Sequence, residues 1–156
     1  MPRVAIALGS NLGDRRGHLD YAAARLNAIL TLTRVSTFIE TEPVDVVGDQ
    51  PAFLNGALVG EFRGTAHELL DRLLAIERER GRVRPHPGAA RTLDLDLVLF
   101  GDLILDDVDL TVPHARFRSR RFVLEPLAEV AGEWVDPATG LTVEELLARL
   151  RSVDSR

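Results

Sequence analysis

The densest group of chemically useful side chains lies between Arg82 and Asp96, in the run Arg-Val-Arg-Pro-His-Pro-Gly-Ala-Ala-Arg-Thr-Leu-Asp-Leu-Asp. Asp94 and Asp96 are two residues apart, so in an extended chain both point to the same side, with Cα atoms about 6.5 Å apart. Two carboxylates held this close repel each other unless water screens them or a cation lies between them. Mg²⁺ prefers such oxygen ligands and commonly accompanies phosphate, so the pair is a candidate metal site.

Arginines flank the same segment. Arg82, Arg84 and Arg91 surround a loop with two prolines and a glycine, and the guanidinium fork matches the geometry of phosphate oxygens. For an isolated Asp-x-Asp, the solvated face of an antiparallel sheet would be the better interpretation. The combination of carboxylates, arginines and loop within one short run favours a site for a metal–nucleotide.

The two aspartates require a strand to position them. Leu93, Leu95, Leu97 and Leu99 alternate with Thr92, Asp94, Asp96 and Val98. A period of two is typical of a strand with one face in the core. The prediction is therefore that the four leucines face the core and that the carboxylates and Val98 face the other way.

Composition limits the classes of protein that the chain can belong to. Its 156 residues, 46% hydrophobic and 28% charged, predict one globular domain spanning 1–156. The net charge of −5 predicts no general affinity for nucleic acid or anionic membrane, although nine arginines oppose seven acids between Arg78 and Arg121. All basic residues are arginine and there is no cysteine, which excludes a P-loop or Schiff-base lysine, disulfides and zinc–cysteine sites. The start has no signal-peptide pattern and no apolar segment is long enough to span a membrane, so we expect a cytoplasmic protein.

The order of predicted elements indicates the fold class. Strands are predicted at 3–8, 32–40, 53–62 and up to 100, with short edge strands at 103–105 and 108–112. Helices are predicted at about 16–30, after the capping box Thr65–Glu68 up to Gly81, at 122–130 with an interruption near Pro126, and after a second capping box, Thr142–Glu145, to about 150. This order predicts an α+β, ferredoxin-like β-α-β-β-α-β sandwich with extra short strands and C-terminal helices.

Two further patterns each have a functional and an ordinary interpretation. Phe53 and Asn55 share one face of a predicted strand, where a ring can stack on a flat heterocycle and a carboxamide can bond to its edge. Alone, they would more simply be a core phenylalanine beside an asparagine near a turn. The turn Gly9-Ser10-Asn11 could hold an anion at a helix start, or simply connect a strand to a helix.

The chain resembles the 6-hydroxymethyl-7,8-dihydropterin pyrophosphokinases of folate biosynthesis over nearly its whole length. The pieces that carry the resemblance are 9–12 (Gly-Ser-Asn-Leu), 53–55 (Phe-Leu-Asn), 81–84 (Gly-Arg-Val-Arg), 91–96 (Arg-Thr-Leu-Asp-Leu-Asp) and 110–114 (Leu-Thr-Val-Pro-His). The piece at 91–96 is highly specific, whereas Gly-Ser-Asn alone is weak.

The resemblance implies transfer of pyrophosphate from ATP to the pterin hydroxymethyl group, with release of AMP and with two Mg²⁺ ions. It implies metal binding by Asp94 and Asp96, and a catalytic role for these two together with Arg82 and Arg91. The implied ATP-binding residues are Glu77, Arg84, Arg91, Thr111, His114 and Arg120, and the implied pterin-binding residues are Thr41, Pro43, Phe53, Asn55 and Phe122. The expected partners are these two substrates, with no nucleic acid and no membrane, and we expect a monomer.

Three positions depart from the family pattern. A loop aromatic is replaced by Gly88 or a neighbour, a tyrosine after the histidine by Ala115, and an arginine by Asp109. These changes bear on loop closure and nucleotide contact. RNA-binding and ligand-sensing modules share the predicted topology, but an RNA reader needs aromatic residues and a basic sheet face, and this chain has carboxylates there and only 5% aromatics.

Overall fold

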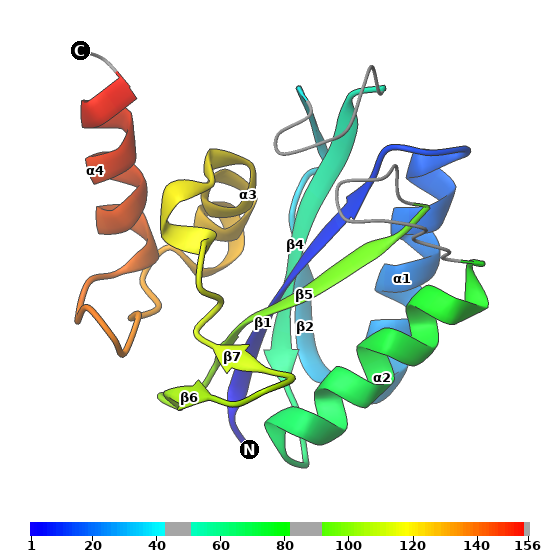
Figure 1. Cartoon of the computed structure of the whole chain (residues 1–156), viewed down its shortest axis with the longest axis horizontal. Coiled ribbons are helices and arrows are strands. Elements are labelled where there is room, and N and C mark those ends of the chain that lie inside the picture. Colours follow the sequence, from blue (N-terminus) through cyan, green and yellow to red (C-terminus); the bar gives the residue numbers. More distant parts are fainter. Residues whose placement is uncertain (43–50, 82–91, 155–156) are drawn as a thin grey trace.

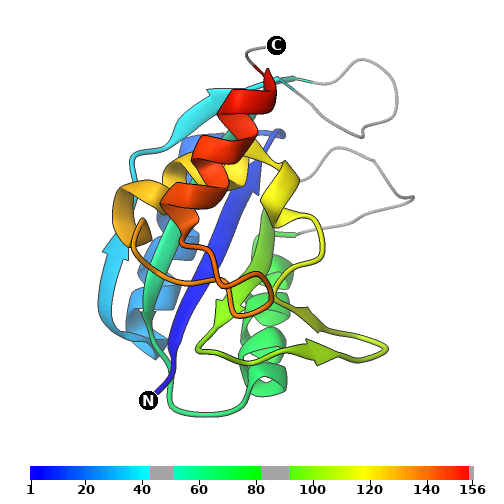
Figure 2. The same cartoon turned by 90° about the vertical axis from the view of Figure 1, so that its left-hand side faces the viewer.

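The computed structural model describes residues 1–42, 51–81 and 92–154. An antiparallel sheet lies between helices α1 and α2 on one face and α3 and α4 on the other (Figures 1 and 2). The elements in chain order are β1 (Arg3–Ser10), α1 (Arg15–Ile29), β2 (Thr31–Val35), β3 (Ile39–Thr41), β4 (Phe53–Glu61), α2 (Ala66–Glu79), β5 (Asp94–Phe100), β6 (Leu105–Asp106), β7 (Thr111–Val112), η1 (Phe117–Ser119), α3 (Arg121–Ala131) and α4 (Val143–Asp154). The mixed architecture of helices on an antiparallel sheet agrees with the predicted α+β class.

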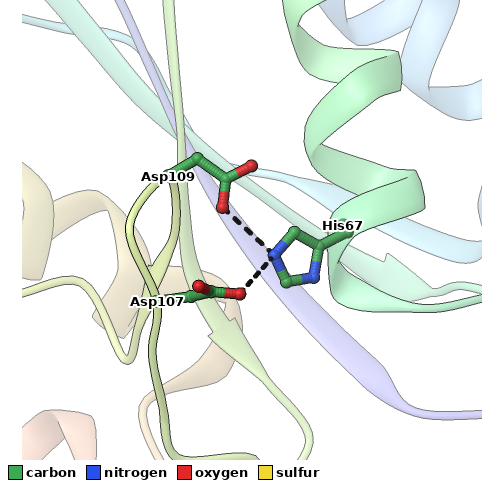
Figure 3. A group of neighbouring side chains, drawn as sticks. All are labelled: His67, Asp107 and Asp109. Carbon is green, nitrogen blue, oxygen red and sulfur yellow. Dashed lines mark hydrogen bonds and ion pairs between the residues drawn. The ribbon is translucent and has the colours of Figure 1, made fainter.

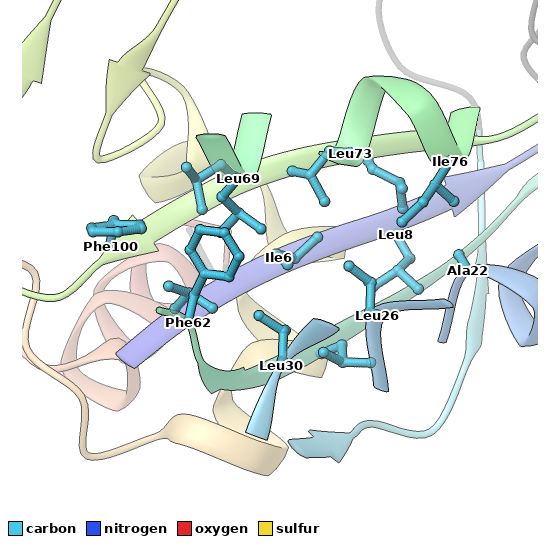
Figure 4. Packing of buried hydrophobic residues seen from close by; sticks show 14 of the residues in the cluster. Ile6, Leu8, Ala22, Leu26, Leu30, Phe62, Leu69, Leu73, Ile76 and Phe100 are labelled. Carbon is cyan, nitrogen blue, oxygen red and sulfur yellow. The ribbon is translucent and has the colours of Figure 1, made fainter. Parts of the chain in front are cut away.

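The strand order is β2-β4-β1-β5, with β3 also paired to β4, and β6 and β7 form a separate two-stranded hairpin. The central strand β1 is apolar on both faces, as its position requires. Its bulky side chains Ile6 and Leu8 pack against α1 and α2, where Leu26 and Leu73 meet them (Figure 4). The small residues Ala5 and Ala7 face α3 and α4. The sheet therefore separates two cores.

Local signals at the helix ends are confirmed. Thr65 and Glu68 form the complete capping box of α2, and Gly81 has the left-handed φ of 72° after its end. At the start of α4, Thr142 N donates to Glu145 Oε1 (3.0 Å) and Glu145 N donates to Thr142 Oγ1 (3.1 Å). These caps satisfy backbone N–H groups that a helix start leaves without partners.

The strand predicted at 32–40 is wrong in one respect, because it is two strands, β2 and β3, both paired with β4. Between them Ser36 N donates to the Ala57 carbonyl (2.9 Å), while Ala57 N donates to the Ser36 hydroxyl (2.8 Å) and not to a backbone carbonyl. Within β2 the register shifts between Thr31 and Arg34, and Leu32 takes a positive φ of 53° with its side chain exposed.

The predicted alternation of β5 is also wrong at its end. Val98 and Leu99 both pack in the α3–α4 core instead of on opposite faces, because the pairing with β1 moves from Leu97 opposite Ile6 to Leu99 opposite Ala5. Val98 is the extra residue of this β-bulge, and its carbonyl accepts a hydrogen bond from His114 N (3.0 Å). The bulge thus fixes the segment that follows β7.

The predicted interruption of the helix at Pro126 is wrong as well. The helix α3 runs without a break from Arg121 to Ala131 with Pro126 inside it. The side chains of Val123, Leu124 and Leu127 are buried in the α3–α4 core, and this packing holds the helix despite the missing N–H of Pro126. The short strands are also shorter than predicted, because a tight turn closed by Asp107 N and the Leu110 carbonyl (2.9 Å) occupies part of the hairpin.

Among the helices of the described ranges, none is both long and apolar enough to cross a membrane.

Candidate active site

A pocket of about 490 Å³ lies where α2, β5, the hairpin β6–β7 and the segment before α3 meet. It brings together six of the residues predicted for metal and nucleotide: Glu77, Asp94, Asp96, Thr111, His114 and Arg120. The other lining residues are Leu70, Leu74, Leu95, Leu97, Asp109, Leu110, Ala115 and Arg116. Carboxylates at one wall and arginines at another suit a cation bound together with an anion.

The Asp-x-Asp pair is held on β5 by a buried carboxylate from α2. Glu77 is only 4% exposed, and its Oε2 accepts a hydrogen bond of 2.7 Å from Leu95 N, the backbone group between the two aspartates. Asp94 and Asp96 are themselves partly exposed and line the pocket. A charge-assisted hydrogen bond to rigid backbone fixes where this part of the strand lies, so Glu77 helps to set the position of both carboxylates.

His114 faces this wall as a neutral imidazole. Burial lowers its pKa below the ordinary value, the nearby Arg120 and Arg116 add to this, and Asp94 opposes them. Its Nδ1 accepts a hydrogen bond from Arg116 N (3.1 Å), so the proton is on Nε2. Within the pocket His114 can therefore act as a neutral hydrogen-bond donor.

A second group of predicted residues lies along the same face of the sheet. Gly9 of β1 pairs with Asn55 on one side and with Asp94 on the other, which places Asn55 and Asp94 about 10 Å apart across two strand spacings. A Cβ at position 9 would lie only 3.1 Å from Asn55 Oδ1 and 3.8 Å from the Phe53 ring. The glycine therefore leaves room over Phe53 and Asn55, beside the carboxylates.

The carboxamide of Asn55 is oriented by a neighbouring strand. Its Nδ2 donates to Thr41 Oγ1, which leaves Oδ1 as the acceptor on the open side. Phe122, partly buried, packs at the edge of the α3–α4 core, on a helix that contacts both β3 and β4. The guanidinium of Arg120 lies 5.5 Å from the Phe122 ring centroid. Thr41, Phe53, Asn55 and Phe122 thus belong to neighbouring elements, with Arg120 connecting them to the pocket.

One wall of the pocket contacts the start of α2 through the side chain of His67. His67 Nε2 lies 3.2 Å from Asp107 Oδ2 and 3.3 Å from Asp109 Oδ1 (Figure 3). Asp109 lines the pocket, and so do the next two residues of the hairpin. The contact therefore helps to hold the hairpin that carries Thr111.

Some predicted residues lie outside the described ranges. These are Arg82, Arg84, Arg91 and Pro43, together with Gly88 and its loop. Other lining residues were not predicted. Arg116 was visible as part of an arginine-rich run, and Leu70 and Leu74 could have been found from their spacing of seven and three residues before Glu77 on one helix face.

Residues 5–132 match the sequence model of the family described as 7,8-dihydro-6-hydroxymethylpterin-pyrophosphokinase, abbreviated HPPK. The chain belongs to this family. It is 37% identical over 147 residues to the 2-amino-4-hydroxy-6-hydroxymethyldihydropteridine pyrophosphokinase of Synechocystis, covering 93% of this chain and 74% of that protein. For the proteins of the same name from Bacillus subtilis and Pseudomonas aeruginosa, the identities are 42% and 41%, covering 90% and 94% of this chain and 84% and 90% of those proteins.

Solved structures of HPPK relatives have the same fold. A Plasmodium falciparum HPPK-DHPS with pterin and p-hydrobenzoate superposes with a TM-score of 0.73 at 15% identity, covering 97% of this chain and 44% of that one. An HPPK-DHPS in complex with substrates gives a TM-score of 0.75 at 12% identity, covering 99% of this chain and 44% of that one. This chain thus spans less than half the length of these two structures, and the likeness concerns the fold alone.

Proposed function

We propose that this chain transfers pyrophosphate from ATP to the hydroxymethyl group of 6-hydroxymethyl-7,8-dihydropterin, as a diphosphotransferase of folate biosynthesis. The observation that carries the proposal is a single row across the sheet, in which Gly9 pairs with both Asn55 and Asp94. This row sets a candidate heterocycle surface beside a candidate metal–phosphate pocket. The names of the curated relatives describe the same chemistry.

The pterin hydroxyl oxygen attacks the β-phosphorus of ATP. A new P–O bond forms, the bond between the β-phosphorus and the α–β bridging oxygen breaks, and AMP leaves with that electron pair while the hydroxyl proton is lost. We assign no general base. Such a reaction depends mainly on positioning and on stabilising charge at the phosphate oxygens.

The residues in the pocket fit a divalent ion. Asp94 and Asp96 present two partly exposed carboxylates on one strand face, and Asp oxygens are suitable ligands for Mg²⁺. When bound there, Mg²⁺ neutralises charge on the triphosphate; we infer two ions. Arg120 and neutral His114 contact phosphate oxygens as donors, Thr111 and Glu77 border the nucleotide, and Arg82, Arg84 and Arg91 complete the phosphate-binding set.

The pterin lies against Phe53 and Phe122. Asn55 Oδ1 accepts a hydrogen bond from the heterocycle, since the Nδ2 of the same amide is engaged by Thr41. Thr41 and Pro43 border this surface.

We also infer that four strands and two helices follow the ferredoxin-like arrangement, since the strand order β2-β4-β1-β5 is the one that this arrangement requires. We further infer that residues 1–156 act as one pyrophosphokinase domain and as a monomer.

The deciding experiment is incubation of the protein with ATP, Mg²⁺ and the hydroxymethyl pterin, followed by separation of nucleotides. AMP formed in equal amount to a pterin diphosphate supports the proposal. Release of ADP would instead indicate transfer of one phosphoryl group, and binding without any turnover would indicate a sensing module.

A further inference from the structure

The pocket arginines lie on a segment that has almost no regular structure of its own. Arg116 and Arg120 line the pocket from the two ends of η1, a single turn between β7 and α3. The backbone is held by hydrogen bonds within the turn, from Ser119 Oγ to the Arg116 carbonyl (3.0 Å) and from Arg120 N to the Phe117 carbonyl (3.2 Å). A turn this short needs tertiary contacts to stay in one place.

One such contact is an ion pair between the middle of the turn and the loop before α4. Arg118 Nε donates to Asp136 Oδ2 at 2.6 Å and Arg118 Nη2 donates to Asp136 Oδ1 at 3.0 Å. Asp136 is completely buried. This is a bidentate, fork-to-fork pair, which fixes orientation as well as distance.

Each oxygen of the Asp136 carboxylate accepts two hydrogen bonds, one of them from Arg118. Oδ1 also accepts from Ala138 N (3.1 Å) and Oδ2 from Thr139 Oγ1 (2.8 Å). Burial alone raises the pKa of Asp136, but the hydrogen bonds from Arg118, Thr139 and Ala138 outweigh it and hold the pKa below its ordinary value. The carboxylate therefore stays charged and rigid, and Arg118 has one fixed position against it.

The three arginines at alternate positions of this segment thus have contacts in two different places. Arg118 turns to Asp136, while Arg116 and Arg120 line the pocket. A buried ion pair contributes little net stability compared with apolar side chains of the same volume, so conformational specificity is the better reason for its presence.

We propose that Asp136 and Arg118 are positioning residues, which orient η1 so that Arg116 and Arg120 face the nucleotide phosphates. This rests on the proposed function for the nature of the ligand. Neither residue touches the substrates; each acts through the two arginines beside it.

The test compares the parent with a double variant, Arg118→Met with Asp136→Leu, which replaces the pair by apolar side chains. Affinity for α,β-methylene ATP, which cannot be cleaved at the reacting bridge, is measured by calorimetry with Mg²⁺. We expect thermal melting close to that of the parent and binding weaker by about tenfold or more, the effect of losing a charged hydrogen bond. In turnover, KM for ATP should rise more than kcat falls, and KM for the pterin should stay within about twofold.

The matched control is Glu125→Gln. It breaks the ion pair from Arg121 to Glu125 (2.8 Å) on the surface of the neighbouring helix and should leave both KM values unchanged. A folded double variant that binds the ATP analogue like the parent would overturn the proposal, because a merely structural pair affects melting but not affinity.

If the double variant does not fold, Arg118→Lys decides, since it keeps the charge but loses the fork. We expect it to fold and to bind the analogue more weakly than the parent; unchanged affinity again overturns the proposal. The comparison of affinities for the ATP analogue does not depend on whether the protein catalyses the reaction. A parent that binds the analogue but releases no AMP contradicts the proposed function, while the effect of the pair on affinity is still decided.

Discussion

The hydrogen bond from Leu95 N to Glu77 gives the candidate metal site its rigidity. It fixes the peptide between Asp94 and Asp96 to a side chain that is itself buried against β5. The two carboxylates therefore keep their separation in the absence of a cation, and their mutual repulsion is built into the folded state. Binding of a divalent ion relieves this repulsion, and this sets the expectation for substitutions at either position.

Asp94→Asn or Asp96→Asn should abolish turnover without harming the fold. Each substitution keeps the shape of the side chain but removes one charge from the proposed metal site and relieves the repulsion. The variants should therefore melt no lower than the parent when both lack metal. AMP release at a rate near that of the parent, from either variant, would contradict the assignment of the metal ligands.

His114 should make stability depend on pH. Its pKa in the folded protein lies below the ordinary value of about 6.5, so below that value the unfolded chain takes up a proton more readily than the folded one. The stability that the neutral imidazole provides is present above pH 6.5 and is lost as the pH falls toward the folded pKa. His114→Gln should lose less stability than the parent between pH 7 and pH 5, as measured by urea unfolding.

His18 provides the comparison for this measurement, because burial and Arg80 lower its pKa also. His18→Gln should remove a separate part of the pH dependence, so neither single variant should abolish it. Identical pH dependence in the parent and in His114→Gln would show that the imidazole of His114 titrates alike in both states.

The alternation of apolar and polar residues at 93–98 was enough to place both aspartates on one face, because residues two apart in a strand point to the same side. The contact of Glu77 with Leu95 could not be predicted, since it joins residues on two elements that only the tertiary fold brings together. Asn55 was identified from its residue type, but its link to Asp94 through Gly9 depends on strand register, which the sequence did not reveal.

Among the elements, helix starts were the most predictable feature. A capping box is local and satisfies its own backbone groups, so both boxes could be recognised from four residues each. The bulge at Val98 was not predictable from its own strand, because a bulge exists only relative to the partner, here the step between Ala5 and Ile6. The continuous helix through Pro126 shows the opposite case, in which tertiary burial overrides a local signal.

Thr65→Ala and Thr142→Ala should each lower the free energy of unfolding by about 1 kcal/mol, the usual effect of losing a side-chain cap. Neither threonine lines the pocket, but Thr65 caps the helix start whose His67 contacts Asp109 of the pocket wall. An unchanged KM for ATP is therefore expected for Thr142→Ala. Chemical unfolding followed by far-ultraviolet circular dichroism measures the first effect and steady-state kinetics the second. A loss of stability below about 0.5 kcal/mol would show that the cap adds little in this context.

The molecule as a whole has two cores that share one sheet. Leu73 belongs to the α1–α2 side and Leu124 to the α3–α4 side, and both are completely buried. Because β1 contributes alternate residues to each side, loosening either core disturbs the same central strand.

Leu73→Ala and Leu124→Ala should each lower the free energy of unfolding by about 2–5 kcal/mol, the usual cost of such a truncation. Each variant should still unfold in one transition, with circular dichroism and tryptophan fluorescence giving the same midpoint. Trp134 packs at the α3–α4 core, so the two signals report on different parts of the molecule. Midpoints that separate in either variant would show that the two sides unfold independently.

The irregular edge strand β2 has a consequence for association between molecules. An edge strand normally offers a straight row of N–H and C=O groups to which another chain can add. Here the shifted register between Thr31 and Arg34 and the left-handed Leu32 interrupt that row, and a bulged, strongly twisted edge is a poor template for pairing. The bulge in β2 therefore disfavours pairing of this edge with a strand of another molecule, even though it exposes the side chain of Leu32 at the surface.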